Sequence, residues 1–393
     1  MQTANVDRIQ SIDLLRGIVM VVMALDHTRD YFHLDSFTSS PTNLATTTPI
    51  LFFTRFITHY CAPLFVFLSG TSAFLYGQKK SKAELSKFLF TRGIWLIFVE
   101  IFINTFLWSF DIHYHYVTLQ VLWAIGCSMM LLAGLIYLPL RYLFLLAALF
   151  MLSHNLLDGI KAEGSSIQAI LWYIVHQSTT VKFTENFRIN FFYPVLPWTS
   201  VMSLGYCLGS LYKSDFDKAL RKKWLLRVGI TCIAMFFVIR GINLYGDKAP
   251  WSYQKDIVFT ILSFFNLSKY PPSLDFALIT IGPGLLFLAY SEQVKSKIAN
   301  FFVVFGSVPF FYYLQHILFI HSFAVITRAI MEYKWESLTE NGQAAASPWA
   351  EFGFSLGATY LIWIGIVLLL YPICKKYMLY KARNKDKWWL SYL

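Results

Sequence analysis

Apolar runs of about 20 residues recur along the whole chain, separated by short polar segments. A run of this length is what an α-helix needs to cross a bilayer. The pattern therefore predicts an all-α fold, a polytopic transmembrane helical bundle of about ten spans, forming a single domain over residues 1–393. The expected spans are 9–32, 55–76, 88–110, 116–138, 140–157, 193–212, 224–242, 273–290, 301–330 and 352–371. Two shorter apolar segments, 167–176 and 257–267, are expected to lie in the membrane interface or to re-enter the membrane.

The composition agrees with lipid as the main solvent. Hydrophobic residues make up 56% of the chain and charged residues 14%, whereas soluble domains have about 25% charged residues. The five cysteines form no CxxC pair, so neither a disulfide framework nor a zinc site is indicated. The first apolar run carries charged residues and no small-residue cleavage site, so we expect it to be a span rather than a cleavable signal peptide.

Lysine and arginine residues cluster after the second, sixth, eighth and tenth expected spans, which all lie on one side of the membrane. By the positive-inside rule these clusters, and with them the N- and C-termini, are expected in the cytoplasm, with the chain in the cell (inner, cytoplasmic) membrane. Membrane insertion then explains the net charge of +11 without nucleic-acid binding, and a further role in attracting an anionic cytosolic ligand stays open. The clusters comprise Lys79, Lys80, Lys82, Lys87 and Arg92; Lys213, Lys218, Arg221, Lys222, Lys223 and Arg227; Lys295 and Lys297; and Lys375, Lys376, Lys381, Arg383, Lys385 and Lys387.

All nine histidines fall toward the outer side in this topology. Ionisable groups at membrane depth are costly and commonly functional. His27 is the first candidate, and His59 and His316 are the next because both are expected at the same depth. The Ser/Thr-rich segment 35–54 follows on the outer side and would be either a lid or an ordinary solvated loop.

The first span carries a polar stripe. At 100° per residue, six of its polar residues fall within one half of the helix: Asp13, Arg16, Asp26, His27, Asp30 and His33. Arg16 and His27 are eleven residues apart, so they point nearly the same way at an axial separation of roughly 16 Å. One helix thus presents a cation near the cytoplasm and an imidazole near the outside.

This stripe suits a long substrate with an anionic head and a reactive tail, such as an acyl-CoA. Arg16, together with Asp13 and with Arg92 of the third span, is expected on the donor side, where a guanidinium would hold phosphates. His27 would act as general base at the reactive end. Asp26 and Asp30 flank it, and Asp30 at i+3 would orient the ring. The alternative is that Arg16 reaches to the interface and His27 merely ends a helix.

Several segments resemble the bacterial heparan-α-glucosaminide N-acetyltransferase-like family of multi-pass membrane acyltransferases. They are RIQSIDLLRG at 8–17, MALDHTRDYF at 23–32, PLFVFLSG at 63–70, LQVLWAIG at 119–126 and VPFFYYLQH at 308–316. The resemblance covers most of the chain. It implies an enzyme that uses cytosolic acetyl-CoA to acylate a sugar presented on the far side of the membrane.

The spacing from Arg16 to His27 also resembles the first helix of bacterial envelope O-acyltransferases. That resemblance implies a catalytic role for His27 and a donor-side role for Arg16. One departure concerns the heparan enzyme, where an asparagine matches Asp26 or His27 and the active histidine comes later. Neither His33 nor His59 matches that later histidine in spacing.

We therefore expect a transmembrane acyltransferase that moves an acetyl or other acyl group from acetyl-CoA to a sugar amine or hydroxyl. Transfer would be direct or would pass through an acyl-histidine. The alternatives are a proton-coupled solute transporter, which would share the buried charges, and a structural membrane protein. His27, Asp30 and His33 have a spacing that could bind a metal on a helix, but nothing supplies a clear further ligand set, so no metal site is expected. The sequence leaves open the acceptor and whether the chain forms a homodimer.

Overall fold

The computed structural model describes residues 9–34, 36, 38–331, 352–384 and 386–391. Asp35 and Lys385, which belong to segments discussed above, lie outside these ranges. The described chain is mostly helical, as predicted. The helices are α1 (Gln10–Phe32), α2 (Pro49–His59), α3 (Cys61–Gly77), α4 (Lys82–Phe98), α5 (Thr105–Ser109), α6 (Val121–Leu135), α7 (Leu140–Ser153), α8 (Ile167–Val175), α9 (Val195–Leu208), α10 (Lys218–Ile242), α11 (Ile257–Phe265), α12 (Leu274–Ser291), α13 (Lys297–Ser307), α14 (Pro309–Ile330) and α15 (Leu356–Arg383).

Within the described residues, seven helical stretches are long and apolar enough to cross a membrane. They are Pro49–Gly77, Lys82–Ser109, Leu140–Leu157, Lys218–Ile242, Leu274–Ser291, Pro309–Ile330 and Leu356–Arg383. Helix α1 has sufficient length but carries several charges, and α6 is shorter than a full span. Seven spans are therefore supported by length and composition, and the count of about ten stays a prediction, as does the orientation of the termini.

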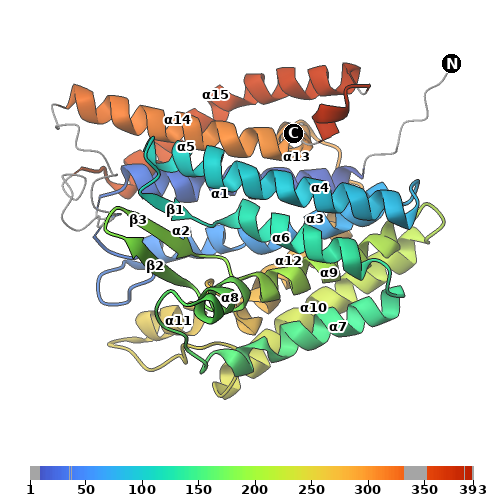
Figure 1. Cartoon of the computed structure of the whole chain (residues 1–393), viewed down its shortest axis with the longest axis horizontal. Helices are drawn as coiled ribbons and strands as arrows, with labels where there is room; N and C mark the ends of the chain where they lie inside the picture. Colours follow the sequence, from blue (N-terminus) through green and yellow to red (C-terminus); the bar gives the residue numbers. More distant parts are fainter. Residues whose placement is uncertain (1–8, 35, 37, 332–351, 385, 392–393) are drawn as a thin grey trace.

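Long helices run side by side between two ends of the molecule (Figure 1). We call one end the basic end, because it holds the lysine- and arginine-rich loops between α3 and α4 and between α9 and α10. The other is the sheet end, which holds α8, α11 and the strands (Figure 1). Helix α1 begins at the basic end and ends at the sheet end, so Arg16 and His27 lie toward opposite ends.

The sheet end contains a small sheet that the hydrophobic pattern did not predict. Strands β1 (Tyr116–Thr118), β2 (Thr179–Thr184) and β3 (Phe187–Phe191) pair in the order β1-β3-β2, with β1 parallel and β2 antiparallel to β3. The expected span 116–138 is therefore wrong at its start, because its first three residues pair with β3 and α6 begins only at Val121.

The expected span 301–330 is also divided into two helices. Helix α13 ends at Ser307, and α14 begins at Pro309. Proline lacks the N–H that would continue a helix, and its fixed φ suits the first position of a new one. Helix α13 packs on the first half of α1, and α14 continues toward the sheet end beside the rest of α1.

The closest packing of α1 on α13 occurs at two glycines. A methyl group at Gly17 would lie 1.9 Å from the Phe302 carbonyl oxygen, and one at Gly306 would lie 1.8 Å from the Asp13 carbonyl oxygen. Small residues let helices in lipid approach to backbone contact. The Arg-Gly pair at 16–17 thus has a structural reason: Gly17 permits the contact, and Arg16 donates a hydrogen bond to the Gly306 carbonyl.

We predict that Gly17→Ala destabilises the protein, because the added methyl meets main-chain atoms that cannot move aside. The expected loss is about 1–3 kcal/mol, measured as a lower thermal unfolding temperature in detergent. Gly365→Ala in α15 is the matched control, because a methyl there meets nothing within 4 Å. Equal melting of wild type, Gly17→Ala and Gly365→Ala would contradict the tight contact.

Candidate active site

The centre of the candidate site is a pair of histidines from α1 and α14. His27 Nδ1 lies 2.7 Å from His316 Nε2, and the two rings stack with centroids 4.9 Å apart. His316 is fully buried, whereas His27 remains partly exposed. Two candidates that are 289 residues apart in sequence therefore meet near the sheet end.

The hydrogen-bond partners assign the tautomers of this pair. His316 Nδ1 lies 2.9 Å from the Tyr312 carbonyl oxygen, which can only accept. A neutral His316 therefore carries its proton on Nδ1, and its Nε2 accepts from the N–H of His27 Nδ1. The lone pair of a neutral His27 is consequently on Nε2, which bonds to no other described residue. This is the arrangement of a general base held in one tautomer.

Aromatic side chains enclose the pair. Trp108 of α5 meets the His27 ring edge-on with centroids 4.8 Å apart, and Tyr313 of α14 does so at 6.4 Å. The Tyr313 hydroxyl accepts from Asn104 Nδ2, which also donates to Glu100. The Glu100 carboxylate in turn accepts the N–H groups of Leu122 and Trp123 in the first turn of α6. Glu100 therefore caps a helix inside the bundle, which explains a carboxylate at this depth.

Asp26 takes part in a charge cluster and not in the histidine pair. Its carboxylate bonds Arg55 of α2 through Oδ2 and lies 2.9 Å from Arg29 Nη2 through Oδ1. Arg29 Nη2 also lies 2.6 Å from Asp30 Oδ1. Asp30, which we expected to orient His27, thus bonds Arg29 instead, and His316 orients the ring. Buried charges in lipid require such pairing.

The structure separates His59 from the pair. Its ring packs between Phe56 and Phe276, with centroid distances of 6.2 and 5.3 Å. His33 Nδ1 lies 3.1 Å from the Phe354 carbonyl oxygen. Among the described residues, no group of three histidine, cysteine, aspartate or glutamate side chains is placed to hold a metal ion.

A pocket near the basic end brings together the two arginines expected on the donor side. Arg16 and Arg92 both line this cavity of about 270 Å³, which lies between α1, α3, α4 and α6. Arg16 donates to Ser72 Oγ at 2.6 Å and lies 3.2 Å from Asp13 Oδ1. Asp13 therefore positions the guanidinium at the pocket.

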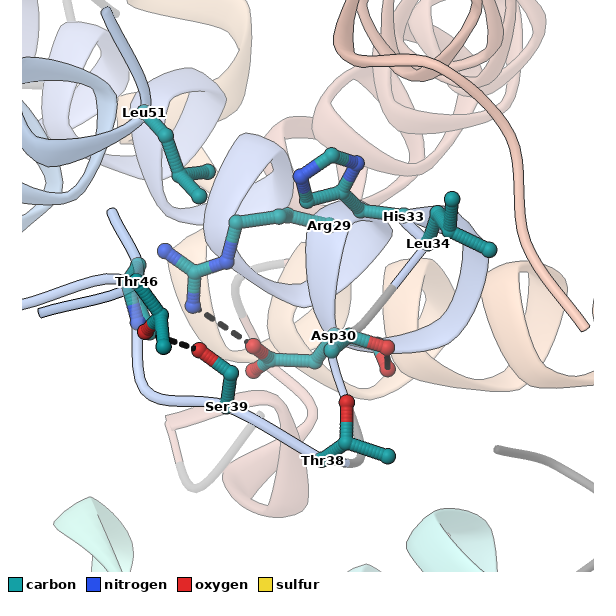
Figure 2. Close-up of a pocket in the computed structure, with 10 residues that line it drawn as sticks. Arg29, Asp30, His33, Leu34, Thr38, Ser39, Thr46 and Leu51 are labelled. Carbon is teal, nitrogen blue, oxygen red and sulfur yellow. Dashed lines mark hydrogen bonds and ion pairs between the residues drawn. The ribbon is translucent and has the colours of Figure 1, made fainter. Parts of the chain in front are cut away.

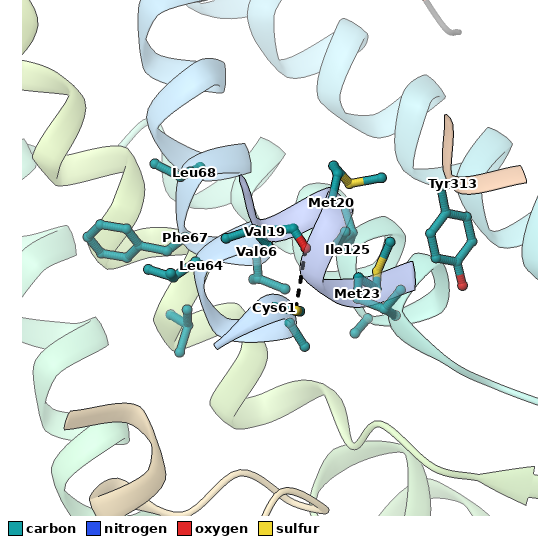
Figure 3. Close-up of a cluster of buried hydrophobic side chains, with 14 of the residues drawn as sticks. Val19, Met20, Met23, Cys61, Leu64, Val66, Phe67, Leu68, Ile125 and Tyr313 are labelled. Carbon is teal, nitrogen blue, oxygen red and sulfur yellow. Dashed lines mark hydrogen bonds between the residues drawn. The ribbon is translucent and has the colours of Figure 1, made fainter. Parts of the chain in front are cut away.

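Two methionines occupy the stripe of α1 between this pocket and His27. Met20 and Met23 are four and seven residues after Arg16, so all three share one face of the helix with His27. Both are buried and pack beside Ile125, with Tyr313 nearby (Figure 3). The route from the arginine pocket to the histidine pair is therefore filled by flexible apolar side chains.

A second pocket, of about 370 Å³, opens at the sheet end of α1 (Figure 2). Arg29, Asp30 and His33 line it from α1, and hydroxyl groups line it from the segment that leads to α2. This segment overlaps the predicted outer segment 35–54, so that segment forms a wall of a pocket.

The sequence reasoning did not identify Arg55, Trp108 or Tyr313 as part of the site. The sequence carries a signal for Arg55, because it is the only lysine, arginine, aspartate or glutamate between Pro49 and Gly77, but the hydrophobic pattern places it at the start of a span. The aromatic residues gave no signal, since 18% of the chain is aromatic.

Comparison with known families agrees with the sequence resemblance. The sequence model of the family described as heparan-alpha-glucosaminide N-acetyltransferase, catalytic, matches residues 8–239. This range includes Arg16, His27, Arg55 and Arg92, whereas His316 lies beyond it. A search of curated proteins found no match. Because the match covers more than half of the chain, the chain belongs to the heparan-alpha-glucosaminide N-acetyltransferase catalytic family, a family of membrane acyltransferases.

Proposed function

We propose that this protein transfers an acetyl group from acetyl-CoA, entering at the basic end, to an amine or hydroxyl of a sugar at the sheet end. By the positive-inside rule the basic end faces the cytosol and the sheet end faces outward from the cytoplasmic membrane. The observation that carries the proposal is the His27–His316 pair, which holds a basic nitrogen on the same stripe of α1 as Arg16.

On the donor side, Arg16 and Arg92 supply two cations to one pocket. Guanidinium groups bind phosphate oxygens in a bidentate manner. The volume of about 270 Å³ is just below the usual range for small-molecule sites, roughly 300–1,000 Å³. It therefore suits the narrow pantetheine arm of the donor, with the nucleotide outside toward the cytosol. The axial separation of roughly 16 Å between Arg16 and His27 is of the order of that arm's length.

The chemical step is direct acyl transfer with His27 as base. The acceptor nitrogen or oxygen attacks the thioester carbonyl, and its proton passes to His27 Nε2. The carbon–sulfur bond then breaks, and the departing thiolate takes the proton to become the free thiol of CoA. His316 is a positioning residue, because it fixes the tautomer of His27 and stabilises the imidazolium that forms during transfer.

The alternative, a proton-coupled solute transporter, has less support. A transport path would need polar groups or water along its length. The stripe between the arginine pocket and His27 is instead occupied by the buried side chains of Met20 and Met23. An acyl donor can displace such side chains with its flexible arm, and the closed stripe would limit leakage of protons.

The first test is binding and slow hydrolysis of labelled acetyl-CoA by the purified protein. Arg16→Gln should weaken binding about tenfold or more, because a charge-assisted hydrogen bond contributes about 1.5–3 kcal/mol. Arg227→Gln is the matched control, because Arg227 is an exposed arginine of α10 near the basic end. If wild type binds neither acetyl-CoA nor CoA, or Arg227→Gln weakens binding as much as Arg16→Gln, the donor assignment is wrong.

In the same assay, His27→Gln should bind acetyl-CoA normally and lose turnover by about 10²–10⁴-fold, the usual contribution of a general base. His316→Gln should lose less, because its side-chain oxygen can still accept from His27 Nδ1. His113→Gln, at an exposed histidine of the sheet end, serves as control. Full turnover by His27→Gln would rule out the proposed base.

The methionines give a separate prediction. Met20→Ala should raise acceptor-free hydrolysis of acetyl-CoA several-fold without changing donor affinity, because the shorter side chain opens the stripe to the thioester and to water. Met151→Ala in α7 removes the same atoms at another buried position and controls for the lost stability. Unchanged or slower hydrolysis by a folded Met20→Ala protein would show that this methionine does not close the route.

A further inference from the structure

The pocket at the sheet end is built by a segment with no other evident task. Described residues between α1 and α2 line the cavity, and most of them carry hydroxyl groups: Ser36, Thr38, Ser39 and Thr46. Thr47 is buried, and its hydroxyl donates to the Pro41 carbonyl at 2.6 Å, while Ser39 and Thr46 bond each other through their hydroxyls at 2.7 Å. Asn266 of the loop after α11 donates to the Thr42 carbonyl. These contacts hold the described part of the segment in place over the pocket.

Two side chains of this pocket keep an acceptor atom available, beside the Arg29 guanidinium, whose Nη1 has no hydrogen-bond partner among the described residues. Asp30 gives Oδ1 to Arg29, and its side chain is 39% exposed, so Oδ2 is available to a ligand. His33 Nδ1 donates to the Phe354 carbonyl oxygen, so the lone pair of a neutral His33 is on Nε2. A ligand that satisfies these atoms must bring O–H or N–H donors.

The opposite side of the pocket is apolar. Leu51, from the first turn of α2, faces the Arg29 side chain across the cavity, with the hydroxyls of Ser39 and Thr46 below it (Figure 2). An apolar surface opposite hydrogen-bonding groups suits a ring with C–H groups on one face and hydroxyls at its edge. The volume of about 370 Å³ lies at the small end of ligand sites, roughly 300–1,000 Å³, which favours one ring over an extended chain.

The pocket is also next to the reacting histidine. Asp30 is three residues after His27, so it lies about 4.5 Å further along the axis and about 60° around the helix. Arg29 Nη2 joins Asp30 to Asp26, the residue before His27. A ring held at Asp30 therefore lies about one helical turn from His27.

We propose that this pocket is the acceptor-binding subsite, which holds one sugar ring through Asp30, His33 and the Ser39–Thr46 hydroxyl pair, with Leu51 against the ring face. The assignment rests on the proposed acyltransferase function and adds the residues that determine acceptor recognition. None of them takes a proton from the acceptor; they set its affinity and position.

The test uses glucosamine as probe, because it carries an amine and several hydroxyls on one ring. Release of CoA from acetyl-CoA by the purified full chain is measured with and without glucosamine. Wild type should release CoA faster with glucosamine and form N-acetylglucosamine. Leu51→Trp, which fills the pocket, should lose this acceleration and still bind acetyl-CoA.

Ile50→Trp is the matched control, since Ile50 is the neighbouring residue, is 67% exposed and does not line the pocket; it should behave as wild type. A Ser39→Ala, Thr46→Val double variant should raise KM for glucosamine about tenfold, as expected for one or two lost hydrogen bonds, with little change in kcat. These two variants keep the pocket open and test the hydrogen bonds separately from its volume.

The possible failures are distinguishable. The subsite assignment is wrong if wild type hydrolyses acetyl-CoA but glucosamine does not accelerate its release of CoA. It is also wrong if glucosamine accelerates CoA release by Leu51→Trp as much as by Ile50→Trp. In both cases the proposed function stands. If wild type neither binds nor hydrolyses acetyl-CoA, the proposed function itself fails.

Discussion

The backbone contact between α1 and α13 at Gly17 and Gly306 determines how His27 and His316 lie relative to each other. It places the start of α14 beside Arg16, so that α14 then follows α1 toward the sheet end and brings His316 to His27. A larger side chain at either glycine would push α1 and α13 apart. The shift would carry α14 with it and break the 2.7 Å hydrogen bond between His27 and His316. A packing contact near the basic end thus controls the geometry of chemistry near the other end.

Two buried carboxylates near the histidine pair show a second constraint, that a charge held away from water needs partners. Asp26 satisfies two arginines, and Glu100 satisfies the first turn of α6. These groups make the site rigid but leave His27 Nε2 unbonded among the described residues. The mechanism depends on this contrast, because a base must keep its lone pair available while its ring is held by neighbours.

Much of this could be predicted from the sequence, because lipid imposes a simple pattern of helix lengths and makes buried charges conspicuous. The stripe with Arg16 and His27 follows from helical periodicity within one span, and the structure retains it. The contact of His27 with His316 depends on how two distant helices pack, which periodicity does not contain. The different partner of Asp30 has a local cause: the neighbouring Arg29 bonds its carboxylate, and a guanidinium is a stronger partner for a carboxylate than a neutral imidazole. The β-sheet was missed because its short strands lie next to apolar runs that resemble spans.

The central claim is that one chain carries an acetyl group from a donor on the basic side of a membrane to an acceptor on the other side. Proteoliposomes test it most directly, with impermeant acetyl-CoA outside and glucosamine sealed inside. The account predicts N-acetylglucosamine in the lumen and CoA outside, and no product with His27→Gln. Product that forms only when donor and acceptor share one compartment would contradict transfer across the membrane.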